Sequence, residues 1–331
     1  MLRTLLVLGA SGLTGYKLMQ LGKKRFETYG TYNLRVTSSL GNNYSNNSDN
    51  YRNNSNNTPW IKLDITKEGD LKKLFKEIRP DIVVNTVASH NVDYCESHEE
   101  EAFNVNTKAV GKIVDLCNNL GSRLVHISTD FVFDGQKRTT YLESDRPNPL
   151  SVYAKSKLEA ELLVRRSATS YSILRPSVVY GWTPLETQGS TSSSGKPMNF
   201  ALWAISKMNR GEELKIVNDQ FTSPTLADIL AAVALRVAVL GKNELYHVSG
   251  GSCLSRYEFT KKISTMMGYS SSSIKPVKSN SFLQAAQRPM NSCLNCQKLQ
   301  TELIYKLPDV DQSLAIMRSQ IEIESPYLLG D

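Results

Sequence analysis

The sequence lacks three features that would point to other classes of protein. No apolar run reaches the length needed to span a bilayer, so we expect no membrane-spanning helix. The first nine residues are too short for a signal peptide, lack a small-residue cleavage site and are typical of a first buried strand. The net charge of +7 suits an anionic ligand, but it is spread along the chain and forms no basic cluster with aromatics. Nucleic acid is therefore not an expected partner.

Cysteine is also scarce, with five residues among 331. An odd count without a secretion signal predicts reduced thiols and a cytoplasmic location. Cys293 and Cys296 form a single CxxC pair, and without a second pair we expect no metal site. What remains is an ordinary globular composition, 40% hydrophobic and 21% charged, in a chain long enough for one large α/β domain or two smaller ones.

A glycine-rich turn follows the first apolar run, LLVLG, and leads into a helical pattern. Strand, glycine turn and helix, in this order, are the context that a dinucleotide site requires. The glycines let the backbone approach a pyrophosphate, which the helix N-terminus then stabilises. The spacing is GxxGxxG, not GxGxxG. The cofactor contacts predicted in this turn are Gly9, Ser11, Gly12, Leu13, Thr14 and Gly15.

The second expected strand, residues 27–33, lacks the acidic residue that usually closes it in NAD-binding sites. Arg35 follows instead, and its guanidinium suits a 2′-phosphate. We therefore predict NADPH as the cofactor, with NADH as the alternative and with a plain surface role for Arg35 left open. Residues 41–58 are an Asn/Ser-rich insertion with nothing to bury, for which we predict a mobile excursion.

Strands and helices alternate through the first half of the chain, which predicts a doubly wound parallel sheet of the α/β class, a Rossmann fold. The expected strands and helices that matter below are a strand at 60–64, a helix at 71–78, a strand at 82–85, one long helix at 102–120, a strand at 172–180, helices at 200–209 and 225–240, and a strand at 245–248. We place the cofactor-binding domain at 1–181, with segments near 217–248 returning to it. A smaller, interleaved substrate-binding part is expected at 182–331.

The stretch from Leu124 to Lys157 organises the chain. Its first part is β-branched and apolar and ends in Ser-Thr-Asp at 128–130, as a buried parallel strand does when its carboxyl end opens into a site. Tyr153 and Lys157 follow on an expected helix, one turn apart on the same face. An ammonium group favours the tyrosine anion, so we expect Lys157 to lower the pKa of Tyr153 toward neutrality. The phenol would then exchange a proton with a carbonyl oxygen that the Thr129 hydroxyl holds by a hydrogen bond.

Ten motifs in family order resemble those of the dTDP-4-dehydrorhamnose reductase family, which are extended short-chain dehydrogenase/reductases: GASGLTG, LDIT, PDIVVNTVA, VDYCE, AFNVN, STDFVFDG, NPLSVYAKSK, ILRPSVVYG, VNDQFTSPT and RPMNS-L. The resemblance covers nearly the whole chain. It implies reduction of a nucleotide-linked 4-keto-sugar by NADPH, with Thr129, Tyr153 and Lys157 as the catalytic set. It also implies a cofactor site lined by Gly12, Leu13, Thr14, Asp64, Ile65, Val87, Ala88, His90, Tyr153 and Lys157, with Asp64 and Ile65 at the adenine.

Two departures from the family lie at the sugar pocket. The family usually reads STDYVFDG where this chain has Phe131, and SWVYG where it has Val178. Trp182 is the candidate replacement for the missing tryptophan. The substrate contacts predicted from the resemblance are Thr129, Asp130, Phe131, Val178 and Trp182. These changes leave hydride transfer intact and leave open which sugar nucleotide is bound.

Two other functions stay open. The chain also resembles the regulatory β subunit of methionine adenosyltransferase, which lacks the same tryptophan and acts by binding a partner enzyme. Retention of Thr129, Tyr153 and Lys157 favours chemistry over that role. A sugar-nucleotide epimerase would need further acid/base groups, which the sequence does not identify. For the assembly, a homodimer is an open alternative.

Overall fold

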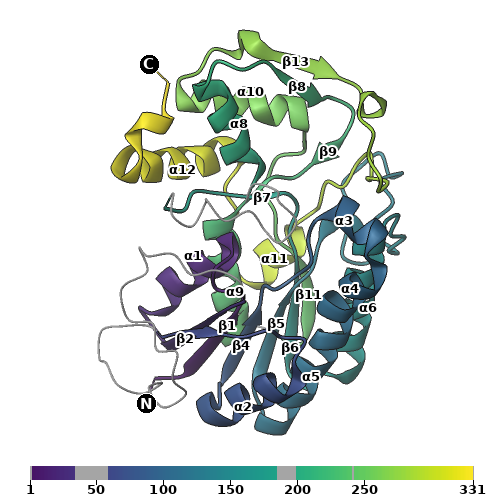
Figure 1. Ribbon diagram of the computed structural model, residues 1–331, viewed down its shortest axis with the longest axis vertical. Coiled ribbons are helices and arrows are strands. Elements are labelled where there is room, and N and C mark those ends of the chain that lie inside the picture. Colours follow the sequence, from purple (N-terminus) through teal and green to yellow (C-terminus); the bar gives the residue numbers. More distant parts are fainter. Residues whose placement is uncertain (1, 34–58, 185–198, 241, 331) are drawn as a thin grey trace.

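A seven-stranded parallel sheet forms the lower half of the structure, a computed structural model that describes residues 2–33, 59–184, 199–240 and 242–330 (Figure 1). The strand order is β11-β6-β5-β4-β1-β2-β3. Because this order reverses between β1 and β4, the crevice at their carboxyl ends is where a doubly wound sheet binds ligands. The predicted α/β class is confirmed. The strands are β1 (Thr4–Leu8), β2 (Glu27–Tyr32), β3 (Trp60–Lys62), β4 (Ile82–Asn85), β5 (Arg123–Ile127), β6 (Tyr171–Arg175) and β11 (Glu244–His247).

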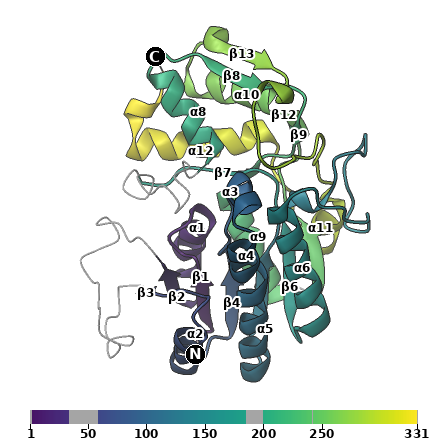
Figure 2. The ribbon, with the colours of Figure 1, turned by 45° about the vertical axis from the view of Figure 1, so that its right-hand side comes forward.

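Helices cover both faces of this sheet, so its central strands β1 and β4 are apolar almost throughout. Along β1, Leu5 and Val7 pack toward one helical layer, while Leu6 and Leu8 pack toward the other. The first layer contains α1 (Leu13–Gly22), α9 (Ala227–Leu240) and α11 (Gln297–Glu302). The second contains α2 (Glu68–Ile78), α5 (Ala109–Leu120) and α6 (Val152–Ser167), and Figure 2 shows α5 and α6 side by side.

A smaller lobe lies above the carboxyl edge of the sheet and has a hydrophobic cluster of its own (Figure 1). Its described residues form two-stranded ladders and three α-helices. The ladders pair β7 (Val179–Tyr180) with β10 (Thr225–Leu226), β8 (Leu214–Val217) with β13 (Ile274–Val277), and β9 (Phe221–Thr222) with β12 (Leu254–Ser255). The helices are α8 (Phe200–Asn209), α10 (Arg256–Met267) and α12 (Val310–Glu324). The buried Lys17 of α1 joins the two parts, since its ammonium lies 3.0 Å from Asp228 on α9 and donates to Gln320 on α12.

The prediction of one long helix at 102–120 is wrong in one respect. Two short helices, α3 (Val92–Ser97) and α4 (Glu99–Phe103), precede a π-helical turn at Asn104–Lys108, and only then does α5 begin. Side-chain hydrogen bonds hold this turn. Asn106 bonds to both backbone groups of Ser89 and to the Ser156 hydroxyl, and Thr107 donates to the Ser156 carbonyl. Such turns are frequent at functional sites.

The single strand expected at 172–180 is also wrong. β6 ends at Arg175, and β7 leaves the sheet to pair with β10 in the other lobe. Val178 lies between them with φ of 41°, a conformation that is strained for a β-branched residue. Two hydroxyls hold the bend: the Thr225 hydroxyl donates to the Ser177 carbonyl at 2.5 Å, and Ser177 itself donates to Asp130.

The expectation that all five cysteines are reduced is wrong for two of them. Cys253 and Cys293 form a disulfide, and Cys95, Cys117 and Cys296 are free. The CxxC sulfurs of Cys293 and Cys296 are therefore not paired with each other. Within the described ranges, no helix is long and apolar enough to cross a membrane. The same part of the chain holds no group of three or more His, Cys, Asp or Glu residues arranged for a metal ion.

Candidate active site

The glycine turn closes tightly between β1 and α1. Gly9 has φ of +83°, and a Cβ there would lie 2.8 Å from the Thr86 hydroxyl at the end of β4. A Cβ on Gly15 would lie 2.2 Å from the Gly9 carbonyl oxygen. The helix cap, Gly12, has no side-chain hydrogen bond, so the first amide groups of α1 have no side-chain acceptor there. These features suit a phosphate group at the helix N-terminus.

The other predicted cofactor contacts lie around the carboxyl ends of β3 and β4. Ile65 is buried, and the Asp64 carboxylate accepts hydrogen bonds from the amide and hydroxyl of Thr66. Val87 and Ala88 are half-buried in the loop after β4, and His90 is exposed. The loop before them is fixed because the Val87 amide donates to the Asn85 side chain. Arg35 and the insertion 41–58 lie outside the described residues.

Thr129 follows directly after β5 and Ser128, at the edge of the sheet beside that loop. It is 7% exposed, and its hydroxyl accepts from the Phe131 amide at 3.2 Å. The same hydroxyl donates to the Asp130 carboxylate at 3.2 Å and lies near enough to the Tyr153 phenol to lower the pKa of that group. The structure therefore brings together two hydroxyls that the sequence separates by two dozen residues.

Helix α6 carries Tyr153 and Lys157, as expected. The Ser151 hydroxyl caps the helix by accepting from the Ala154 amide, and Glu96 of α3 accepts from the Val152 amide at 2.8 Å. These two caps satisfy orphan amides of the first turn and fix where the helix begins. The tyrosine position one residue into the helix is therefore set by local hydrogen bonds.

The expected lowering of the tyrosine pKa is wrong. Burial raises the pKa of Tyr153 above its ordinary value, and the nearby Asp130 carboxylate adds to the increase, while the Thr129 hydrogen bond opposes it. The Lys157 ammonium is directed elsewhere, to the Ile127 carbonyl at 2.6 Å and the His126 ring at 3.5 Å. The phenol therefore stays protonated at neutral pH, which is the form that a proton donor needs.

Lys157 is nearly inaccessible, with 2% of its side chain surface exposed. Burial lowers its pKa from 10.5 to about 8, and the Glu161 carboxylate one turn further along α6 opposes that shift. Burial and the Lys157 charge together hold the pKa of His126 well below its ordinary value. A neutral imidazole thus lies against the lysine.

Glu161 and Arg175 are residues that the sequence reasoning missed. Both are almost fully buried, and Arg175 at the end of β6 binds the Glu161 carboxylate through two nitrogens, at 2.8 and 2.6 Å. The Ser128 hydroxyl donates to the same carboxylate. The pair thereby ties α6, β6 and the strand end before Thr129 together. The available signal was Arg175, a charged residue at the end of the apolar strand pattern in SILRP.

The predicted substrate residues have different environments. Phe131 is half-buried, and its ring meets the Tyr153 ring edge-on at 6.2 Å. Val178 is half-buried at the bend between the two lobes. Trp182 is 2% exposed inside the cluster of the smaller lobe, which favours a packing role. Asp130 is also 2% exposed, and three hydroxyl groups already occupy its carboxylate, so it has little capacity left for a sugar.

A family model, described as the RmlD substrate binding domain, matches residues 3–322. The chain belongs to the RmlD family. Among its relatives, the dTDP-4-dehydrorhamnose reductase of Escherichia coli K12 is 32% identical over 257 residues, covering 74% of this chain and 81% of the relative. The probable low-salt glycan biosynthesis reductase of Haloferax volcanii is 31% identical over 261 residues, 79% of this chain and 84% of that one.

Solved structures of the same family have the same fold. The dTDP-4-dehydrorhamnose reductase of Bacillus anthracis, in complex with NADP, superposes with a TM-score of 0.80 at 26% identity and covers 97% of this chain and 100% of its own. The UDP-glucose 4-epimerase of Thermotoga maritima, at 19% identity and a TM-score of 0.76, shares the fold alone. Two motifs far apart in this sequence meet in the fold: Asp93 of VDYCE forms an ion pair with Arg288 of RPMNS.

Proposed function

We propose that this RmlD-family chain reduces the 4-keto group of a nucleotide-linked sugar with NADPH, as its dTDP-4-dehydrorhamnose reductase relatives are named to do. The observation that carries the proposal is the meeting of the Tyr153 phenol and the Thr129 hydroxyl at the carboxyl edge of the sheet. Two hydroxyl donors side by side suit the oxygen of a carbonyl that gains negative charge. Lys157 lies one helical turn away from that pair.

The glycine turn supports a dinucleotide cofactor. The close approach at Gly9 and Gly15 leaves no room for side chains, and the Gly12 cap leaves the N-terminus of α1 open to a pyrophosphate. The relative bound to NADP supports NADPH over NADH. When bound, the reduced cofactor supplies hydride to the carbonyl carbon.

This chain's own residues supply the rest of the chemistry. Tyr153 donates its proton to the carbonyl oxygen as negative charge develops there, and its raised pKa keeps that proton in place beforehand. Thr129 holds the same oxygen by a hydrogen bond. Lys157 provides a positive charge beside the site, and the cofactor ribose is its proposed partner. Phe131 and Val178 line the sugar side, and their identity is expected to set which nucleotide sugar is accepted.

The test is a spectrophotometric assay of NADPH oxidation by the purified chain with a panel of nucleotide 4-keto-sugars, dTDP-4-dehydrorhamnose first. Turnover by the chain alone supports the reductase. Absence of turnover with every sugar, together with co-purification of a methionine adenosyltransferase, would replace it by the regulatory-subunit alternative. A cytoplasmic location and a homodimer belong to the same proposal, and cell fractionation and analytical ultracentrifugation test them.

A further inference from the structure

A buried carboxylate lies directly behind the proposed oxygen-binding hydroxyl. Asp130 follows Thr129 and is 2% exposed. One of its oxygens accepts from the Ser177 hydroxyl at 2.7 Å and from the Ser292 hydroxyl at 2.5 Å, and the other accepts from the Thr129 hydroxyl at 3.2 Å. The Thr129 hydroxyl has one proton, so it can donate a hydrogen bond either to Asp130 or to a substrate oxygen, but not fully to both. The more hydrogen bonds Asp130 accepts from Ser177 and Ser292, the more weakly its carboxylate competes for the Thr129 proton.

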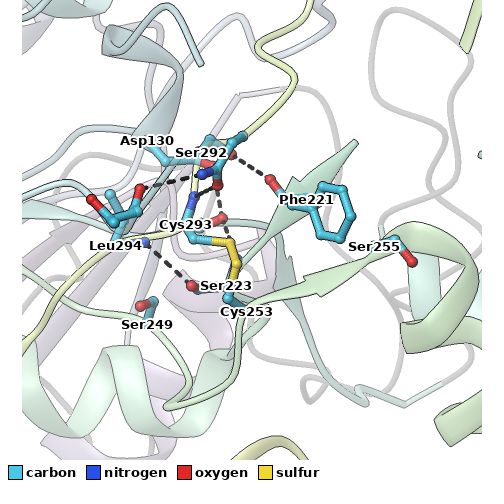
Figure 3. The surroundings of a disulfide bond; sticks show 12 residues. Asp130, Phe221, Ser223, Ser249, Cys253, Ser255, Ser292, Cys293 and Leu294 are labelled. Carbon is cyan, nitrogen blue, oxygen red and sulfur yellow. Dashed lines mark hydrogen bonds between the residues drawn. A yellow bond between two sulfur atoms is a disulfide. The ribbon is translucent and has the colours of Figure 1, made fainter. Parts of the chain in front are cut away.

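Ser292 reaches this carboxylate from 162 residues further along the chain, and its neighbour Cys293 is bonded to Cys253 (Figure 3). Cys253 lies in the loop between β11 and β12, in the part of the chain that also forms the smaller lobe. Around Ser292, its amide donates to the Phe221 carbonyl, and the Leu294 amide donates to the Ser223 hydroxyl. The disulfide is the one covalent cross-link on this segment among the described residues. Its other ties are hydrogen bonds: two backbone bonds to Phe221, two to Tyr141 and the bond to Ser223.

We propose that the Cys253–Cys293 disulfide is a clamp that positions Ser292, and through it Asp130 and Thr129, for the reduction; this inference rests on the proposed function. With the clamp closed, Ser177 and Ser292 donate to the Asp130 carboxylate beside Thr129, so the carboxylate holds the Thr129 proton only through a bond of 3.2 Å, and a substrate oxygen can compete for that proton. With the clamp open, the segment carrying Ser292 is freer to withdraw. When the buried Asp130 carboxylate loses the Ser292 donor, it should accept a stronger hydrogen bond from a donor that remains, the Thr129 hydroxyl.

An external thiol can reach the disulfide from one side. Cys253 is exposed, whereas Cys293 is fully buried, so an external thiolate attacks the Cys253 sulfur. That attack breaks the S–S bond, forms a mixed disulfide with Cys253 and leaves the Cys293 sulfur to take a proton. A second external thiol then displaces Cys253, so that the protein gains two electrons and two protons and the thiols become a disulfide. Cytosolic thiol pools favour the open form of exposed bridges.

The experiment compares steady-state kinetics of the oxidised protein before and after treatment with dithiothreitol. Opening the clamp should lower kcat about tenfold, the scale of one hydrogen bond to a charged group, while the KM for NADPH stays unchanged. The matched control is the Cys253→Ser/Cys293→Ser double variant, which should have the lower kcat with or without dithiothreitol. Ser292→Ala should lower kcat similarly, and reduction of that variant should add little, because both changes act through the same hydroxyl.

Two results would overturn the clamp. The first is a kcat that stays unchanged after verified reduction of the disulfide. The second is a reduced Ser292→Ala protein whose loss in kcat equals the product of the two separate losses, because the disulfide would then act independently of Ser292. Hydrogen exchange separates this inference from the proposed function, because it needs no substrate. If no sugar is turned over, faster exchange of the peptide around Thr129 after reduction still supports the clamp, and unchanged exchange contradicts it.

Discussion

The Phe131 ring meets the Tyr153 ring edge-on, with centroids 6.2 Å apart and planes inclined by 78°. Edge-to-face pairs of this kind contribute about 0.5–1.5 kcal/mol beyond their buried area. Phe131 therefore supports the ring of the proposed proton donor and is also one of the proposed sugar contacts. The position at which this chain departs from the family pattern is in direct contact with the proposed chemistry.

Phe131→Ala should lower kcat by about threefold to tenfold, because Tyr153 loses the ring that restricts its orientation, at a cost of about 1 kcal/mol. Phe131→Tyr is the matched control, since it keeps the ring and adds the hydroxyl usual in the family. It should retain kcat and change only the KM for the sugar. Steady-state kinetics with both substrates varied measures these effects. Equal kcat in all three proteins would show that the Phe131 ring does not orient Tyr153.

Gly15→Ala should weaken NADPH binding by tenfold or more. Its Cβ would lie 2.2 Å from the Gly9 carbonyl oxygen, and backbone cannot yield as a flexible side chain does, so the turn must open. Gly69→Ala is the control: it is also a helical glycine, but nothing lies within 4 Å of its added Cβ. That variant should bind NADPH normally and be slightly more stable, by up to about 1 kcal/mol. Fluorescence titration of NADPH compares the two, and equal affinities would show that the turn does not bind the cofactor.

The kcat/KM for the sugar should fall as pH rises through about 8, because Lys157 loses its proton there and the site loses its positive charge. Glu161→Gln should move this fall to lower pH, since the carboxylate raises the pKa of Lys157. The variant leaves Arg175 without its charge partner, so its unfolding midpoint must be followed at each pH. A profile that stays flat from pH 7 to 10 would rule out a role for the ammonium.

Deprotonation of Lys157 lowers kcat/KM as pH rises, but it should increase the free energy of unfolding. Between pH 8 and 10.5 the unfolded chain holds the Lys157 proton and the folded protein does not, so the unfolded state binds more protons. This residue therefore makes the protein more stable as pH rises through that range. Lys157→Met should remove that increase, and denaturant unfolding of both proteins at pH 7 and 10 measures the difference. An equal pH dependence in both would show that Lys157 is not the titrating group.

Reduction of the disulfide should also lower the free energy of unfolding, by about 2–4 kcal/mol, because the bridge closes a loop of 40 residues in the unfolded chain. Urea unfolding with and without dithiothreitol measures this. The Cys253→Ser/Cys293→Ser variant should show no difference between the two conditions. A difference in that variant would show that the effect does not come from the Cys253–Cys293 disulfide.

The sheet was predictable because its central strands β1 and β4 are apolar runs, and because the glycine turn is a local sequence pattern. The helix at 200–209 and the strand at 82–85 match the structure residue for residue. The π-helical turn was not predictable, because it depends on Asn106 finding Ser89 and Ser156, partners that only the tertiary fold brings close. The bend at Val178 was missed although Pro176 interrupts the strand pattern, because the partners that hold it, Thr225 and Asp130, come from other parts of the chain.

The site was predictable as a set of residues but not in its electrostatics. Spacing alone placed Tyr153 and Lys157 on one helix face, and it suggested that the ammonium lowers the tyrosine pKa. In the fold, burial raises the pKa of Tyr153, and the Lys157 ammonium donates to the Ile127 carbonyl. Neither fact can be deduced from the spacing of the two residues. The Cys253–Cys293 pair was missed because cysteine counting uses the parity of the set and the compartment, while pairing depends on which two loops the fold brings together.

The measurement that tests the central claim most directly is the turnover of Tyr153→Phe with NADPH and a nucleotide 4-keto-sugar that the unaltered chain reduces. The substitution removes the proton donor and keeps the ring that packs on Phe131. We expect kcat to fall by about 10²-fold or more, the scale of general acid catalysis, with NADPH affinity nearly unchanged. Near-full turnover by a correctly folded Tyr153→Phe protein would contradict the assignment of Tyr153 as the acid.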